Sequence, residues 1–224
     1  MNSYLKILNG IKYGDIIGGP YRLAKILTKS LETNQCFNEK DLRKQYLKWW
    51  TNGAFDTGPT FASVFTKINE GMCPQKAVII THNKFHQNTA GCGPAHRASP
   101  IAGFMKIKTE NLIRIARNEA KITHYHKDAG NGSAIILILC RFLLEGKNLN
   151  ESQELISRNK ELRDSWLKVK KAQLKPDGYV YNVIHSALYF VKENKSLNYA
   201  IKFSGKANYC SVLVGAILAC LNNK

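Results

Sequence analysis

Acidic residues are scarce in this sequence, and it contains no clustered run of basic residues. Against 33 lysines and arginines there are only 16 aspartates and glutamates, which gives a formal net charge of +17. Such an excess creates a positive potential over part of the surface. It suits either a polyanionic partner or a lysine-rich, solvated exterior. Because no basic tail and no helix-turn-helix signature accompany the charge, we do not expect nucleic acid to be the main partner.

Paired cysteines and long apolar runs are also missing. None of the six cysteines forms a Cys-x-x-Cys pair, which argues against a zinc site or a disulfide framework. Residues 1–12 lack the apolar core of a secretion signal. The longest nearly apolar stretch, residues 212–221, is about half of the ~20 residues that span a bilayer. We therefore expect a protein that does not insert into membranes and that acts in the cytoplasm, either of its own cell or of a host cell if it is a secreted effector. The sequence leaves the oligomeric state open, and a monomer is our expectation.

Apolar residues recur at helical spacing almost throughout, and no segment shows strand alternation or an internal repeat. Asn38 can cap one of the predicted helices. Residues 134–144 and 211–221 are apolar nearly all round, which is typical of helices buried on most sides. Because 44% of the residues are hydrophobic, the chain can build a sizeable core. The sequence predicts a single all-α domain over residues 1–224.

Four short motifs follow one another along the chain. They are Gly-Asp-Ile-Ile-Gly at 14–18, Trp-Trp with Asp-Thr-Gly-Pro-Thr at 49–60, Gly-Cys-Gly-Pro-Ala-His-Arg at 91–97, and Ile-Thr-His-Tyr-His at 122–126. Their order and spacing resemble the ADP-ribosylglycohydrolase family, whose motifs are Gly-Asp-Ala-Leu-Gly, Asp-x-Gly-x-Thr, Gly-Asn/Cys-Gly-x-x-Met-Arg and Leu-Thr-His-x-His. A weaker echo is Asp-Gly-Tyr-Val at 177–180. The resemblance implies a compact bundle of orthogonal helices that binds ADP-ribose or an ADP-ribosylated protein, and the cysteine in the third motif is similar to the arginine-specific branch.

The resemblance also implies roles for individual residues. Asp56 is the expected catalytic acid, in a loop between Phe55 and Phe61; the alternative is that it caps the helix beginning at Pro59. Asp15 is the second candidate acid, and a plain turn residue is its alternative. A glycine-containing loop lets a phosphate approach the backbone N–H groups. The residues expected to contact ADP-ribose are Thr57, Gly58, Phe85, Asn88, Thr89, Gly91, Cys92, Gly93, Arg97, His124 and Lys206.

The carboxylates that bind two magnesium ions in this family have no counterpart here. The first cluster, Thr/Ser-Asp-Asp-Thr, is replaced by Gly-Gly-Pro-Tyr at 18–21, and the second, Gly-Asp-x-Asp-Thr, by Gly-Lys-Ala-Asn-Tyr at 205–209. Magnesium requires hard oxygen ligands, and a lysine at that position would repel a dication. We therefore expect no magnesium, no other metal and no cofactor, with the Lys206 ammonium occupying the space of a cation beside ribose or pyrophosphate oxygens.

Three functions are compatible with these observations. The first is an ADP-ribosylarginine-type glycohydrolase that works without magnesium, through a transition state of oxocarbenium character. The second is a catalytically inactive ADP-ribose-binding protein with the same pocket. The third is a basic, helical nucleic-acid-binding protein, which only the net charge favours. We favour the first because the ligand-side motifs persist while both metal clusters are gone together.

Overall fold

The computed structural model describes residues 2–205 and 209–221, and this part of the chain is helical almost throughout, with no strand. Only an isolated bridge between Gly91 and Tyr179 is of β type. The all-α prediction is therefore confirmed. The helices, with two 3₁₀ turns, are α1 (Ser3–Gly14), α2 (Gly19–Asn34), α3 (Glu39–Thr51), α4 (Pro59–Asn69), α5 (Pro74–Lys84), α6 (Gly93–Ala98), η1 (Ser99–Gly103), η2 (Thr109–Asn111), α7 (Leu112–Ala120), α8 (Lys127–Leu144), α9 (Leu149–Arg158), α10 (Arg163–Lys171), α11 (Val180–Lys192), α12 (Leu197–Ser204) and α13 (Cys210–Leu221).

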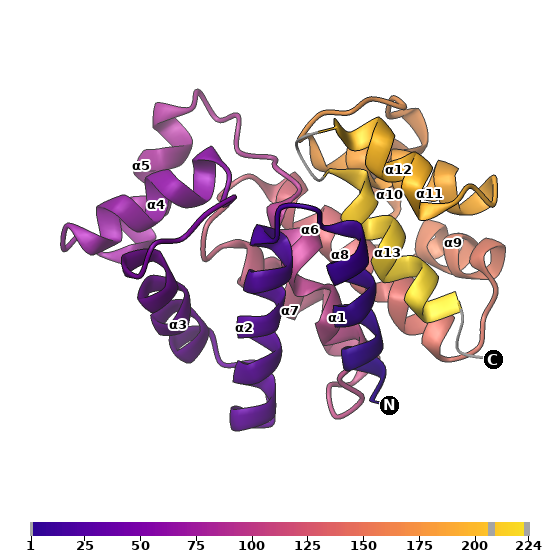
Figure 1. The fold of residues 1–224 in the computed structure, drawn as a ribbon, viewed down its shortest axis with the longest axis horizontal. Coiled ribbons are helices and arrows are strands. Elements are labelled where there is room, and N and C mark those ends of the chain that lie inside the picture. Colours follow the sequence, from indigo (N-terminus) through magenta and orange to yellow (C-terminus); the bar gives the residue numbers. More distant parts are fainter. Residues whose placement is uncertain (1, 206–208, 222–224) are drawn as a thin grey trace.

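The centre of the bundle is built from α1, α2, α8 and α13, with α3 to α5 on one side and α9 to α12 on the other (Figure 1). Helices α1 and α13 pack with their backbones nearly touching. A Cβ atom at Gly10 would lie 2.2 Å from the carbonyl oxygen of Gly215 and 2.8 Å from Cβ of Ala219. Glycine is therefore required at this crossing, because any side chain would push the two helices apart.

Helix α8 is the buried helix that the apolar pattern of residues 134–144 predicts, and it begins seven residues earlier, at Lys127. The one charge in that apolar pattern is Arg141. Its Nε donates to the carbonyl oxygen of Ala102 at 2.7 Å, and its Nη1 donates to Oγ1 of Thr109 at 3.1 Å. The guanidinium thus satisfies polar groups of the 3₁₀ turns that cover the helix, which is why a charge is tolerated there.

The helix cap predicted at Asn38 is confirmed. Asn38 caps α3, since its side-chain oxygen accepts the N–H of Asp41 at 3.1 Å.

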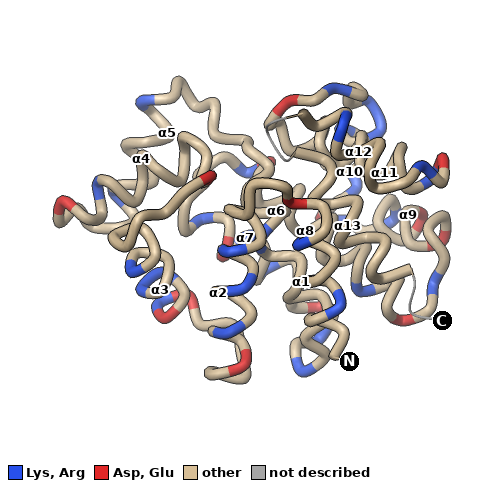
Figure 2. Tube along the Cα trace, in the orientation of Figure 1, with Lys and Arg blue, Asp and Glu red and all other residues tan. Residues whose placement is uncertain are grey.

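Lysines and arginines are spread over most of the helices and do not gather on one of them (Figure 2). Within residues 2–205 and 209–221, no helix has the length and apolar character needed to cross a membrane.

Candidate active site

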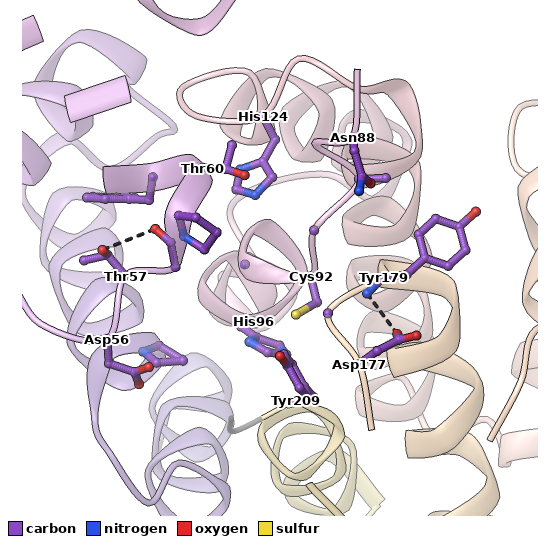
Figure 3. A pocket seen from close by; sticks show the side chains of 18 residues that line it. Asp56, Thr57, Thr60, Asn88, Cys92, His96, His124, Asp177, Tyr179 and Tyr209 are labelled. Atoms are coloured by element: carbon purple, nitrogen blue, oxygen red, sulfur yellow. Dashed lines mark hydrogen bonds between the residues drawn. The ribbon is translucent and has the colours of Figure 1, made fainter. Parts of the chain in front are cut away.

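A cavity of about 460 Å³ lies where the α3–α4 loop, the loop before α6, the α7–α8 loop and the starts of α11 and α13 meet (Figure 3). Its volume suits a small-molecule ligand. The structure brings to it eight of the sequence-predicted site residues: Asp56, Thr57, Gly58, Asn88, Gly91, Cys92, Gly93 and His124. The polar side chains that sequence reasoning missed are Thr60, His96, Asp177, Tyr179 and Tyr209.

Asp56 lies on the α3–α4 loop at one flank of the cavity (Figure 3), with a backbone φ of +50°, a conformation that aspartate tolerates better than most residues. Its Oδ2 accepts the N–H of Gly19 at 3.3 Å, at the first residue of α2. A Cβ atom at Gly19 would lie 2.3 Å from the carbonyl oxygen of Asp56, so only glycine allows the loop to rest there. The capping alternative is therefore wrong for α4, whose N-cap is Gly58 without a side-chain bond.

Asp15 does not line the cavity, and this position corrects its assignment as a second catalytic acid. Its carboxylate is buried and accepts backbone N–H groups from Gly18 at 2.7 Å, Tyr21 at 2.7 Å and Ile17 at 3.3 Å. A carboxylate at a helix N-terminus satisfies N–H groups that have no partner within the helix. Asp15 therefore shapes the α1–α2 turn, as its alternative interpretation proposed.

The loop before α6 is held against the start of α11. The N–H of Cys92 donates to the carbonyl oxygen of Gly178 at 3.0 Å, and the N–H of Val180 donates to that of Ala90 at 3.0 Å. The Cys92 N–H is thus already bonded and does not serve as the free phosphate donor expected of this loop. Burial raises the pKa of the Cys92 thiol to about 12, so the side chain is a neutral thiol and not a nucleophile.

Arg97 also lies outside the cavity, which corrects its expected pairing with phosphate. It is fully buried, its Nε bonds Oε1 of Glu119 at 2.6 Å, and its Nη2 donates to Oγ1 of Thr123 at 2.8 Å. Although burial works against the charge, the Glu119 carboxylate raises the pKa of Arg97, so the guanidinium is charged. The Tyr46 hydroxyl donates to the same Glu119 oxygen at 3.2 Å, which ties α3, α6 and α7 together.

His124 closes the top of the cavity in Figure 3 and is connected to this buried ion pair. Its Nδ1 lies 2.7 Å from Oγ1 of Thr123, and its Nε2 lies next to Gly91, where an added Cβ atom would be 3.0 Å away. Burial, with a smaller contribution from Arg97, lowers the pKa of His124 to about 3. The ring is therefore neutral at physiological pH.

His96 contributes a second buried imidazole to the cavity lining. Burial lowers the pKa of His96 to about 4, and within the described residues its Nε2 has no hydrogen-bond partner. It stands where the resembling motif has methionine, and Tyr209 stands where the family's metal cluster has threonine. Neither position carries a family motif residue, so neither has a sequence signal that marks it as part of the cavity.

Asp177 is the second carboxylate at the cavity. Its Oδ1 accepts the N–H of Tyr179 at 3.1 Å, and its Oδ2 accepts a hydrogen bond from Nδ2 of Asn182 at 2.9 Å. Nζ of Lys175 lies 3.3 Å from the same Oδ2. The Asp-Gly-Tyr-Val echo at 177–180 was the signal that could have found it.

The remaining expected contacts fall elsewhere. Phe85 ends α5 and does not line the cavity, and Thr89 is buried with its hydroxyl 2.6 Å from Nδ1 of His82. Neither residue is among those that line the cavity, which corrects the expectation of a direct ligand contact. Lys206 lies outside the described residues.

The structure thus defines a helical protein whose cavity is lined by residues from three of the four motifs and by their neighbours. A family model described as ADP-ribosylglycohydrolase matches residues 20–222, so the chain belongs to this family. A solved structure described as an ADP-ribosylglycohydrolase-related protein complex has a TM-score of 0.72 and 17% sequence identity. That match covers 98% of this chain and 87% of the other. No curated protein matches the sequence significantly.

The carboxylates around the cavity do not form a cluster in the part of the chain that the structure describes. Among the described residues, no group of three histidine, cysteine, aspartate or glutamate side chains could hold a metal. The two carboxylates at the cavity, Asp56 and Asp177, come from different loops, and both oxygens of Asp177 already accept hydrogen bonds. Magnesium binding by clustered carboxylates is therefore not supported by these residues.

Proposed function

We propose that this protein hydrolyses the N-glycosidic bond between ADP-ribose and an arginine side chain of a modified protein, and that it does so without magnesium. The observation that carries the proposal is the position of Asp56, a partly exposed carboxylate on the flank of the ligand cavity, in a chain that belongs to the ADP-ribosylglycohydrolase family. The arginine linkage is supported by the Gly-Cys-Gly motif at 91–93.

In the reaction, a water oxygen bonds to the anomeric carbon of the ribose while the bond from that carbon to the guanidine nitrogen breaks. One water proton goes to the departing nitrogen, so the products are free ADP-ribose and an unmodified arginine. Asp56 accepts a hydrogen bond from the attacking water or from a ribose hydroxyl and stabilises positive charge on the ribose in the transition state. His124 and Thr60 line the same cavity and lie next to each other in Figure 3, where both would contact the ligand.

A second candidate is an ADP-ribose-binding protein without turnover. One observation favours it, namely that Asp15 is engaged with backbone N–H groups outside the cavity and does not act as a second acid. Binding would then rely on the same lining residues, and replacement of Asp56 would have no rate to lower.

The test is the release of ADP-ribose from an arginine-ADP-ribosylated protein, with and without excess EDTA. We expect equal release in both conditions, lost at least 100-fold in Asp56→Asn. The matched control is Asp164→Asn, an exposed aspartate on α10, which should release ADP-ribose at the wild-type rate. Release abolished by EDTA would refute metal independence. Binding of ADP-ribose without release would support the second candidate, and neither binding nor release would refute both.

A further inference from the structure

We propose that Thr123 and Arg97 fix the tautomer of His124, so that the ring presents an Nε2–H donor to the cavity and keeps its lone pair on Nδ1. Neither Thr123 nor Arg97 lines the cavity, and both are therefore positioning residues. The identity of the ligand, ADP-ribose, rests on the proposed function. The tautomer itself is a property of the free protein.

The hydrogen-bond geometry around the threonine hydroxyl carries the proposal. Oγ1 of Thr123 accepts a hydrogen bond from Nη2 of Arg97 at 2.8 Å. Its single proton then has two acceptors within reach, Nδ1 of His124 at 2.7 Å and the carbonyl oxygen of Ala120 at 3.5 Å. A hydrogen bond weakens steeply with distance, so the proton lies on the line to Nδ1.

The opposite tautomer would place N–H on Nδ1 and make the same hydroxyl oxygen accept two donors. One of these donors is a guanidinium, which polarises the hydroxyl and makes it a better donor and a poorer acceptor. The threonine proton would then have only the 3.5 Å contact to the Ala120 carbonyl. The arginine cannot reverse this pattern, because a guanidinium has donors and no acceptor.

The guanidinium is itself fixed from the other side. Its Nε bonds Oε1 of Glu119, and it lies over the Tyr46 ring with its Cζ 5.5 Å from the ring centroid. Arg97 and Glu119 are 1% and 0% exposed, so no solvent competes for these bonds. A buried ion pair of this kind adds little net stability. Its presence here is explained if it orients a group that touches the ligand.

The consequence for the cavity is a neutral imidazole that only donates at its exposed edge. Nε2 of His124 lies close to Gly91, where an added Cβ atom would be 3.0 Å away, and both residues line the cavity. An Nε2–H group selects an acceptor, such as a diphosphate oxygen of ADP-ribose, and it cannot accept a hydrogen bond from a hydroxyl group unless the tautomer changes. His124 is thus set for one hydrogen-bond direction before the ligand arrives.

The test is the long-range ¹H–¹⁵N correlation spectrum of the free, ¹⁵N-labelled protein at pH 7, with the His124 signals assigned by their loss in His124→Gln among the six histidines. We expect a protonated Nε2 and an unprotonated Nδ1. In Thr123→Val, which keeps the shape and removes the hydroxyl, the ring should become a mixture of tautomers, and Thr123→Ser should restore the wild-type spectrum. Thr28→Val, which removes a buried threonine hydroxyl in α2, is the control.

Calorimetric titration with ADP-ribose supplies the second measurement. Affinity should fall about tenfold in Thr123→Val and stay within about twofold of wild type in Thr123→Ser. A proton on Nδ1 in the wild-type protein, or an unchanged spectrum in Thr123→Val, would overturn the proposal. If the spectra agree but the wild-type protein does not bind ADP-ribose, the tautomer assignment stands and the proposed function fails.

Discussion

Acidification from pH 8 to pH 5 is expected to destabilise the protein through its two cavity imidazoles. Burial lowers the pKa of His124 to about 3 and that of His96 to about 4, whereas the same side chains titrate near 6.5 when exposed. As the pH falls, the unfolded chain therefore takes up protons first. The stability contributed by the neutral rings is complete above pH 6.5 and is lost progressively as the pH falls towards the folded pKa values.

The magnitude follows from these values. Each ring costs about 1.4 kcal/mol per pH unit below 6.5, so about 2 kcal/mol per ring is lost at pH 5, or about 4 kcal/mol for the pair. Urea denaturation at pH 8, 7, 6 and 5 measures this loss of unfolding free energy for the wild type and for His96→Met/His124→Gln. In the double variant the loss between pH 8 and pH 5 should be smaller by about 4 kcal/mol. His86→Asn, at an exposed residue with φ of +49°, is the control and should keep the wild-type loss. Equal losses in the wild type and the double variant would refute the reasoning.

Three further outcomes are expected from substitutions around the site. Arg97→Met should lower the free energy of unfolding by about 3–5 kcal/mol, because it leaves the carboxylate of Glu119 buried without its partner, whereas Arg97→Met/Glu119→Leu should recover most of that loss in urea denaturation. Gly19→Ala should displace the loop that carries Asp56, because the new Cβ atom would lie 2.3 Å from the carbonyl oxygen of Asp56. This displacement should lower the rate of ADP-ribose release at least tenfold. Asp15→Ala should lower the melting temperature by about 2–8 °C through loss of a helix cap, with the affinity for ADP-ribose unchanged in calorimetry.

The sequence predicts the helices well because their signals are local. The Asn38 cap and the apolar run at 134–144 each depend on a few neighbouring residues, and both are confirmed. The start of α8 is less predictable, because residues 127–133 are polar or small. His126 caps the helix by accepting the N–H of Asp128, and Gly132 packs against Val180, where an added Cβ atom would lie 2.3 Å from a methyl group. That contact is tertiary and has no local signature.

The residues of the site likewise fall into those whose position the sequence predicts and those whose position it does not. Residues within a contiguous motif, such as Gly91 and Gly93 or the loop around Asp56, reach the cavity as predicted. Charged residues were harder to place, because a motif gives the position of a Cα atom and not the direction of a long side chain. Arg97 follows the glycine loop directly in the sequence, yet α6 turns its side chain inward to Glu119 and away from the ligand.

A buried charge pair within a ligand-binding motif calls for a physical reason, because apolar side chains of the same size would serve packing at least as well. Residues 97, 119 and 123 are all buried, and among their side-chain hydrogen-bond partners in the part of the chain that the structure describes, only His124 lines the cavity. Motif positions of this kind therefore combine two roles that a sequence cannot separate. Some residues touch the ligand, and others determine which hydrogen-bonding face the touching residue presents. Only the three-dimensional network assigns Arg97 to the second group.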